Sequence, residues 1–141
     1  MKKKINLDFH HLGLATSNLN STLKILKSLG YNVDSIKINK AFNVRNAICK
    51  SSKMPKIEVI SKIKGSKSPI DNLLKKQSNS IYHICYMSNN LNDTLKSFKK
   101  NKIDYTRVSN PEFSPFEGVY SSFFYISGIG LVEIMDRSSK K

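Results

Sequence analysis

The hydrophobic pattern of the first half of the chain predicts a strand, a helix and then three more strands. Residues 7–15 alternate between apolar and polar positions, as expected of a strand. Ser17 or Asn18 would cap the helix that follows. Leucines between positions 19 and 29 then recur at helical spacing, and Gly30 ends the helix. Three further stretches have the character of strands: 31–38, 42–49 and 56–62.

A connecting helix is expected in residues 66–78. Ser68 suits the N-cap, Pro69 the first turn, and Asp71 the positive end of the helix dipole. Asn79-Ser80 would end this helix, and its buried side would consist of Ile70, Leu73, Leu74 and Gln77.

The second half of the chain repeats the order of the first. Residues 81–87 predict a strand, and Asn89 or Asn90 would cap a helix with Leu91, Leu95 and Phe98 on its inner side. Residues 110–118 predict a long loop, and three more strands are expected at 103–108, 119–126 and 131–136.

Individual residues also match between the halves. His11 aligns with His83, 72 positions later, and Asn18 aligns with Asn90. An internal repeat indicates two copies of one supersecondary unit. We therefore expect an α+β fold in one domain spanning residues 1–141, with a first βαβββ module at 7–64 and a second at 80–136.

Composition narrows the class of protein. A chain of 141 residues with 39% apolar residues can bury a core, and it has no apolar run of the length that spans a bilayer. The start of the chain lacks the apolar stretch of a signal peptide, and the two cysteines are far apart in the sequence. We expect a cytoplasmic protein with reduced thiols and no membrane partner.

The formal net charge of +14 comes mainly from lysine, since 21 of the 24 basic residues are Lys. Nucleic-acid readout favours arginine, so we expect no nucleic-acid partner. A solvated lysine-rich surface is the simplest interpretation, and a surface that attracts a phosphorylated or carboxylated small molecule is the functional alternative.

Four residues occupy matching places in the repeat and predict a metal site. His11 and His83 lie in the first strand of each module, and Glu58 and Glu133 lie in the last. Each of them taken alone would be a structural or solvent-facing residue. Together, two imidazoles and two carboxylates suit a divalent metal, namely Co, Mn, Ni, Fe or Zn.

Alternation along the strands supports this assignment. If His11 faces a cleft, Leu12 and Leu14 face the helices, and for Glu133 the helix side is formed by Val132 and Ile134. The same alternation places His10 on the face opposite His11, so His10 is left out of the site.

These motifs resemble the vicinal oxygen chelate superfamily of glyoxalase I, bleomycin-resistance proteins and extradiol dioxygenases, and most of all its methylmalonyl-CoA epimerases. The resemblance covers roughly residues 7–136 and rests on five motifs: His11 to Ala15, Ile57 to Ile60, Ser68 to Ile70, Tyr82 to Tyr86 and Gly130 to Ile134. It implies two modules that form an open, cup-shaped mixed sheet around one metal. It also implies His11, His83 and Glu133 as ligands, with Glu58 at a position where the epimerases commonly have Gln or another ligand.

One position departs from the epimerase pattern. The residue aligned with the glutamate base of the first module's third strand is Asn46, which cannot accept a proton. Glu117 and Glu112, in the loop before the second module's last two strands, are the candidate substitutes for this base. The candidate catalytic residues are therefore Glu117 and the ligand Glu133.

Three functions remain open at this point. The first is a metal-dependent isomerase or epimerase that stabilises the enolate of a small carboxylated or CoA thioester substrate. The second is a glyoxalase I-like lactoylglutathione lyase, which a homodimer with sites shared between subunits would favour. The third is a non-catalytic protein that binds a drug or a metabolite, as bleomycin-resistance proteins do.

Overall fold

The computed structural model describes residues 4–114 and 116–140, and the chain divides into two compact units. We call residues 11–82 the first unit, and residues 4–10 together with the described residues of 83–140 the second unit. The expected domain of residues 1–141 also includes residues 1–3, 115 and 141, which lie outside the described part of the chain.

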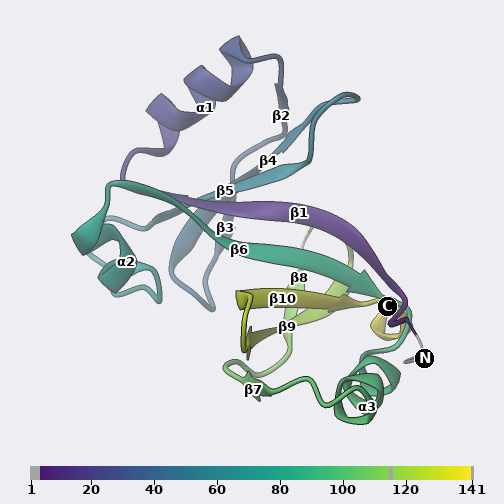
Figure 1. The fold of residues 1–141 in the computed structure, drawn as a ribbon. Helices are drawn as coiled ribbons and strands as arrows, with labels where there is room; N and C mark the ends of the chain where they lie inside the picture. Colours follow the sequence, from purple (N-terminus) through teal and green to yellow (C-terminus); the bar gives the residue numbers. More distant parts are fainter. Residues whose placement is uncertain (1–3, 115, 141) are drawn as a thin grey trace. The chain divides into compact units, whose positions relative to one another are not determined.

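The first unit is a mixed sheet with one long helix (Figure 1). Its strand order is β2-β4-β5-β1, with β3 also paired to β4; β5 is parallel to β1 and antiparallel to β4. The strands are β1 (Leu7–Thr16), β2 (Asn32–Val33), β3 (Lys37–Asn39), β4 (Val44–Lys50) and β5 (Ile57–Lys62), and the helices are α1 (Leu19–Ser28) and α2 (Asp71–Lys76).

The second unit has the same arrangement. Its strand order is β6-β10-β9-β7, with β8 also paired to β9; β10 is parallel to β6 and antiparallel to β9. Its elements are β6 (Asn79–Ser88), α3 (Leu91–Lys100), β7 (Tyr105–Arg107), β8 (Glu112–Ser114), β9 (Val119–Ile126), β10 (Gly130–Asp136) and a short 3-10 helix, Arg137–Ser139. The predicted α+β class with a mixed sheet and repeated βαβββ order is therefore confirmed.

The strand that follows each long helix is interrupted, which the sequence pattern did not predict. The single strand expected at 31–38 is divided into β2 and β3, and the loop expected at 110–118 contains β8. The interruption occurs at equivalent places, because Asp34 N donates to Ile48 O at 2.9 Å and Val108 N donates to Phe123 O at 2.9 Å. In both units the chain leaves the edge of the sheet after this bond and returns as a second short strand.

Helix α2 is shorter than the 66–78 segment in which it was expected. It begins at Asp71, and the N-cap residue is Ile70 rather than Ser68. Ser68 N donates a hydrogen bond to Asp71 Oδ2 at 3.0 Å, and this bond, with Lys62 nearby, lowers the pKa of Asp71. Gln77 is exposed rather than buried, and Asn79 and Ser80 begin β6 instead of ending the helix.

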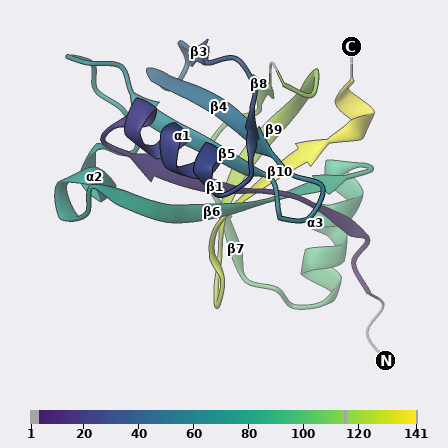
Figure 2. The same cartoon turned by 90° about the horizontal axis from the view of Figure 1, so that it is seen from above.

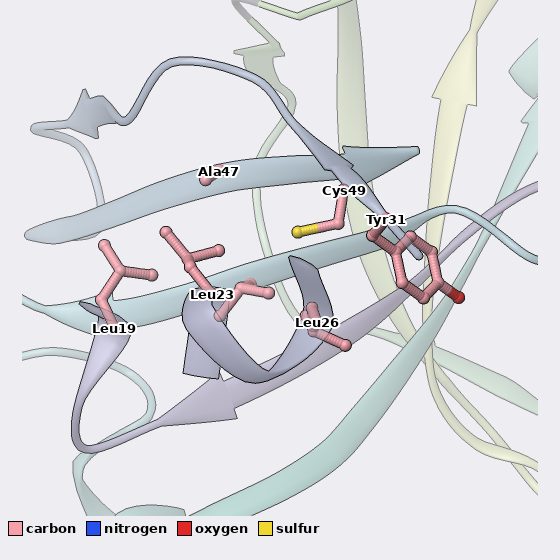
Figure 3. Packing of buried hydrophobic residues seen from close by; sticks show 7 residues of the cluster. Leu19, Leu23, Leu26, Tyr31, Ala47 and Cys49 are labelled. Atoms are coloured by element: carbon pink, nitrogen blue, oxygen red, sulfur yellow. The ribbon is translucent and has the colours of Figure 1, made fainter. Parts of the chain in front are cut away.

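Each long helix packs its apolar side on its own sheet. Seen from above, α1 lies over strands of the first unit (Figure 2). Figure 3 shows the three buried leucines of α1 directed at β4. They belong to a cluster whose members are Leu19, Leu23, Leu26, Tyr31, Ala47, Cys49 and Val59. Burial of each leucine contributes about 1.5–3 kcal/mol. The same burial, with a smaller effect of Asp34, raises the pKa of the Cys49 thiol to about 11.

The helix of the second unit packs on an aromatic core. This cluster consists of Leu91, Phe98, Phe124, Ile126, Val132 and Ile134. The Phe124 ring is fully buried, and it meets the Tyr105 ring edge-on at 5.9 Å and the Arg107 guanidinium at 5.4 Å. Among residues 4–114 and 116–140, no helix is both long enough and apolar enough to cross a membrane.

The two helices begin with the same polar arrangement. Asn18 Oδ1 accepts a hydrogen bond from Ser21 N at 3.0 Å, and Asn90 Oδ1 accepts one from Asp93 N at 3.1 Å. Of the two caps proposed for each helix, the structure therefore uses Asn18 and Asn90. Such caps stabilise a helix by satisfying a backbone N–H that has no partner within the helix.

The second unit is discontinuous in sequence, because the start of the chain belongs to it. Ile5 packs against the aromatic core of this unit, and the Phe9 ring meets the Tyr86 ring edge-on at 6.4 Å. Asp8 forms an exposed ion pair of 2.8 Å with Arg137. The N-terminal part of β1 is thus held by residues that follow it by more than 70 positions.

Candidate functional site

His11 is placed by the alternation of β1 in the first unit. His11 and Ala15 are fully buried on one face of the strand, whereas Leu14 packs against the α1 cluster on the other. In the parallel pair of β1 and β5, Gly13 lies opposite Glu58. This register brings Glu58 Oε1 to 3.9 Å from His11 Nε2.

His83 is placed in the same way in the second unit. His83 is buried on one face of β6, whereas Tyr86 packs with the α3 cluster on the other. In the parallel pair of β6 and β10, Cys85 lies opposite Glu133. Glu133 Oε1 consequently lies 3.4 Å from His83 Nε2.

The two His–Glu pairs are equivalent in backbone register. In each unit the glutamate lies opposite the residue two positions beyond the histidine, and in each the Nε2 atom faces an Oε1 atom. The face assignments made from the sequence for His11 and Glu133 agree with this arrangement, since Leu14 packs on the helix side of β1 and Val132 and Ile134 on that of β10.

Each pair has donors and spacing that fit a divalent metal. The N···O distances of 3.9 and 3.4 Å are longer than the usual 2.7–3.2 Å of a hydrogen bond. Two ligands at about 2.0–2.2 Å from one tetrahedral ion lie roughly 3.4 Å apart. The carboxylates are nearly buried, and a buried carboxylate is costly unless a cation or hydrogen bonds compensate its charge. The residues therefore fit the metal that the sequence predicts.

Asn46 lies beside the first unit's carboxylate. It is buried on β4, and its Nδ2 donates a long hydrogen bond of 3.5 Å to Glu58 Oε2. Its Oδ1 has no hydrogen-bond partner among the described residues. The side chain at the position of the expected base thus orients Glu58 and retains an acceptor, but it cannot remove a proton.

The second unit places Glu117 against a histidine that the sequence pattern left out. Glu117 Oε1 lies 2.8 Å from His10 Nε2, and the two side chains are one-third exposed and one-tenth exposed respectively. The other loop acid, Glu112, lies in β8 opposite Ser121.

His10 does not follow the simple alternation of β1. A ring nitrogen of His10 lies within 4.8 Å of Cys85 Sγ, and Cys85 is on the face of β6 that also contains His83. His10, which the alternation placed on the face opposite His11, therefore has a ring nitrogen close to a residue on the His83 face of β6. Its position depends on Glu117, more than 100 residues later, so the periodicity of β1 alone contains no signal for it.

Another apolar cluster of the second unit lies on the face of β6 that contains His83. It is formed by Cys85, Met87, Val119 and Met135. The Phe123 ring meets the His83 ring edge-on at 5.2 Å and lies opposite Glu133 in the strand pair. The imidazole is therefore packed from the side by an aromatic ring, which fixes its orientation.

Known proteins were compared with the sequence and the structure. The profile of the Glyoxalase/Bleomycin resistance protein/Dioxygenase superfamily matches residues 10–121. No curated protein matches the sequence.

Several solved structures have the same fold. Methylmalonyl-CoA epimerase from Mycobacterium tuberculosis is similar with a TM-score of 0.73 at 17% identity, over 92% of this chain and 87% of that one. A hypothetical protein from Bacillus halodurans C-125 has a TM-score of 0.75 at 19% identity, over 93% and 94% of the chains. A variant of the Streptomyces coelicolor methylmalonyl-CoA epimerase, in complex with 2-nitronate-propionyl-CoA, has a TM-score of 0.69 at 16% identity, over 93% and 98%.

At these identities the solved structures establish the shared fold, as the resemblance of the motifs had suggested. The superfamily profile covers most of the chain. The protein therefore belongs to the glyoxalase/bleomycin resistance protein/dioxygenase superfamily.

Proposed function

We propose that this protein is a metal-dependent isomerase that forms and reprotonates the enolate of a small carboxylated thioester. The observation that supports this most directly is the equivalence of the two His–Glu pairs, which have the same register and facing atoms in both units. Two such pairs supply two nitrogen and two oxygen donors, which suits one divalent ion of the Co, Mn, Ni, Fe or Zn group. We propose His11, Glu58, His83 and Glu133 as its ligands.

A divalent metal in this site would supply a Lewis acid that polarises a substrate carbonyl, which lowers the cost of removing the neighbouring proton by several kcal/mol. The protein's own residues would orient the ligands and exclude water. Asn46 holds Glu58 on one side, and the Phe123 ring fixes the His83 imidazole. The apolar cluster around Cys85 and Met135 would exclude water from the His83–Glu133 pair.

A CoA thioester is the substrate class we propose. Two observations support it: methylmalonyl-CoA epimerases share the fold, and the structure of the Streptomyces enzyme contains a propionyl-CoA analogue. The net charge of +14 would favour a ligand with phosphate and carboxylate groups. Since the charge is mainly from lysine, this attraction should weaken as salt is added.

Metal content and proton exchange test the proposal together. Protein purified without chelator should contain one equivalent of a divalent transition metal, measured by elemental analysis. With methylmalonyl-CoA in D₂O, NMR should detect replacement of the α-proton by deuterium. Asp93→Asn, an exposed substitution on α3, is the matched control and should alter neither result. Protein that takes up metal but never exchanges the α-proton would refute the isomerase proposal.

A metabolite-binding protein is the alternative that one observation favours. Asn46 stands where a base is expected, and a protein without that base could bind a ligand without changing it. The Asn46→Glu variant separates the two functions. In an isomerase with a single base, the added carboxylate should increase racemisation relative to deuterium exchange, because racemisation needs a base on each face of the enolate. In a binding protein it should produce neither reaction.

A lactoylglutathione lyase would give a different pattern of results. It would convert the hemithioacetal of methylglyoxal and glutathione, and it would leave the α-proton of methylmalonyl-CoA unexchanged. Chromatography with light scattering would report whether the protein is a homodimer, which is the assembly that this function favours.

A further inference from the structure

The described residues include one partly buried contact between a histidine and a carboxylate that the proposed metal site does not use. His10 Nε2 and Glu117 Oε1 are 2.8 Å apart, which is hydrogen-bond distance. A carboxylate only accepts hydrogen bonds, so in the tautomer with a proton on Nε2 the imidazole is the donor of this bond. The nitrogen–oxygen distance at His10 is shorter than those at His11 and His83, whose facing carboxylate oxygens are 3.9 and 3.4 Å away.

The place of this pair in the second unit connects it with the candidate site. A ring nitrogen of His10 is within 4.8 Å of Cys85 Sγ. Cys85 in turn lies opposite Glu133 in the pairing of β6 with β10. The His10 ring therefore lies close to the strand pair that carries His83 and Glu133.

Exposure separates the roles of the two side chains. Glu117 is one-third exposed, whereas His10 is nine-tenths buried. The carboxylate is therefore more accessible than the imidazole to solvent and to a ligand. The loop turns sharply after Glu117, because Gly118 has a φ of 69° and its N–H bonds to Ser114 O at 2.9 Å. This turn limits the positions that Glu117 can adopt.

From these contacts we infer that Glu117 is the proton acceptor of the isomerase and that His10 is its positioning residue. This inference rests on the proposed function. The pair supplies the carboxylate that Asn46 cannot supply, and it does so from the second unit rather than the first. His10 keeps its own proton throughout and acts only by holding Oε1.

The step balances without any further reactant. The α-C–H bond of the thioester breaks, its electron pair remains on the substrate as the enolate, and an O–H bond forms at Glu117 Oε2. Because Glu117 is partly exposed, the acquired proton can be replaced by a deuteron from D₂O. Return of that deuteron to the same carbon gives labelled substrate with no net oxidation or reduction.

Three variants test the inference, with methylmalonyl-CoA in D₂O as the probe and metal content measured for each. Glu117→Gln should lower kcat for deuterium exchange by about 100-fold or more, the usual contribution of a general base, with little change in KM. Asp93→Asn, the exposed acid on α3, is the control and should keep the rate of the unaltered protein. All variants should bind one equivalent of metal.

His10 is tested by loss and rescue. His10→Ala should lower kcat about tenfold, the effect expected for a lost hydrogen bond to a charged group. His10→Gln, whose amide can still donate to Glu117, should recover most of that loss. A purely structural role would instead lower metal content or stability in both variants and would not distinguish alanine from glutamine.

The outcomes separate this inference from the proposed function. If the unaltered protein exchanges the α-proton and Glu117→Gln exchanges it equally fast, the role of Glu117 as proton acceptor is overturned and the proposed isomerase function is retained. If His10→Gln is no better than His10→Ala at equal metal content, the positioning role of His10 is overturned. If the unaltered, metal-loaded protein exchanges no proton, both the proposed isomerase function and the roles of Glu117 and His10 are overturned.

Discussion

The two units have the same backbone plan but different surroundings for their ligands. Both have a histidine and a glutamate at matching register, and both begin their long helix with an asparagine cap. In the first unit the glutamate is held by Asn46, whereas in the second the histidine is packed by Phe123 and a His–Glu contact lies nearby. The positions shared by the units are those suited to metal ligation, and the positions that differ are those suited to acting on a substrate.

The cores of the two units also differ in their side chains. The first packs leucines against Ala47 and Cys49, and the second packs Phe98 and Phe124 around Val132. A repeated backbone therefore does not require repeated side chains, provided that the volume between helix and sheet is filled. The comparison teaches that the register of the strands, more than the composition of the core, positions the four candidate ligands.

Removal of one histidine is the severest test of the equivalence. If both units contribute to a single metal site, His11→Ala and His83→Ala should lower metal affinity to a similar extent. The loss should exceed about 100-fold, because even partners outside the ligand shell cost about 10–100-fold. Isothermal titration of the metal-free variants with Zn²⁺ measures it. An effect confined to one histidine would mean that the units do not share the metal.

Truncation of the cores should separate the units by stability. Phe124→Ala should cost about 3–5 kcal/mol of unfolding free energy, because it leaves a cavity and removes ring contacts with Tyr105 and Arg107. Leu23→Ala, the matched substitution in the first unit, should cost about 2–5 kcal/mol and less than Phe124→Ala in the same urea titration. Equal losses would argue against a special contribution of the aromatic core.

The thiol of the first unit's core should be slow to react. A pKa of about 11 instead of 9.0 leaves roughly 100-fold less thiolate at pH 8, so iodoacetamide should label Cys49 about 100-fold more slowly in the folded protein than in urea. Peptide mass spectrometry reads this residue separately from Cys85. Rapid labelling of the folded protein would contradict the burial described for β4.

The same thiol predicts a dependence of stability on pH. Because its pKa is raised in the folded state, the unfolded state loses the Cys49 proton first as pH rises above about 9. The contribution of Cys49 to stability is therefore complete below that pH and decreases as pH rises toward 11. Cys49→Ala should remove this component of the pH profile measured by urea denaturation.

The helix caps should give the smallest effect and the closest agreement between units. Asn18→Ala and Asn90→Ala each remove one side-chain acceptor of a backbone N–H, so each should cost about 0.5–2 kcal/mol. Thermal unfolding followed by circular dichroism would measure both variants. A difference of several kcal/mol between them would show that the repeat is not energetically equivalent at this position.

The sequence predicted the fold well because its strong periodicities are local. Alternation along β1 and β6, the leucines of α1 and the caps of both helices are each determined by neighbouring residues. It failed at the interrupted edge strands, where backbone bonds to a distant strand decide the ends of the element. It also failed at the start of α2, where Ser68 N bonds to the Asp71 side chain instead of Ser68 capping the helix. Short edge strands have no periodicity long enough to be recognised.

The candidate site was only partly accessible to the same reasoning. The repeat identified His11, Glu58, His83 and Glu133, because two copies of one module mark equivalent positions. His10 had no counterpart in the second half, since position 82 is a tyrosine, and its contact with Glu117 depends on the path of a distant loop. A residue that breaks the repeat can thus be found only once the three-dimensional path is known.

The discontinuity of the second unit has a consequence for the order in which the protein folds. Residues 11–82 form a unit that is contiguous in sequence, so every partner within it has been synthesised once residue 82 is added. Residues 4–10 are synthesised before all of them, yet their partners Tyr86 and Arg137 are synthesised later. The contacts of residues 4–10 are therefore completed only after Arg137 has been synthesised.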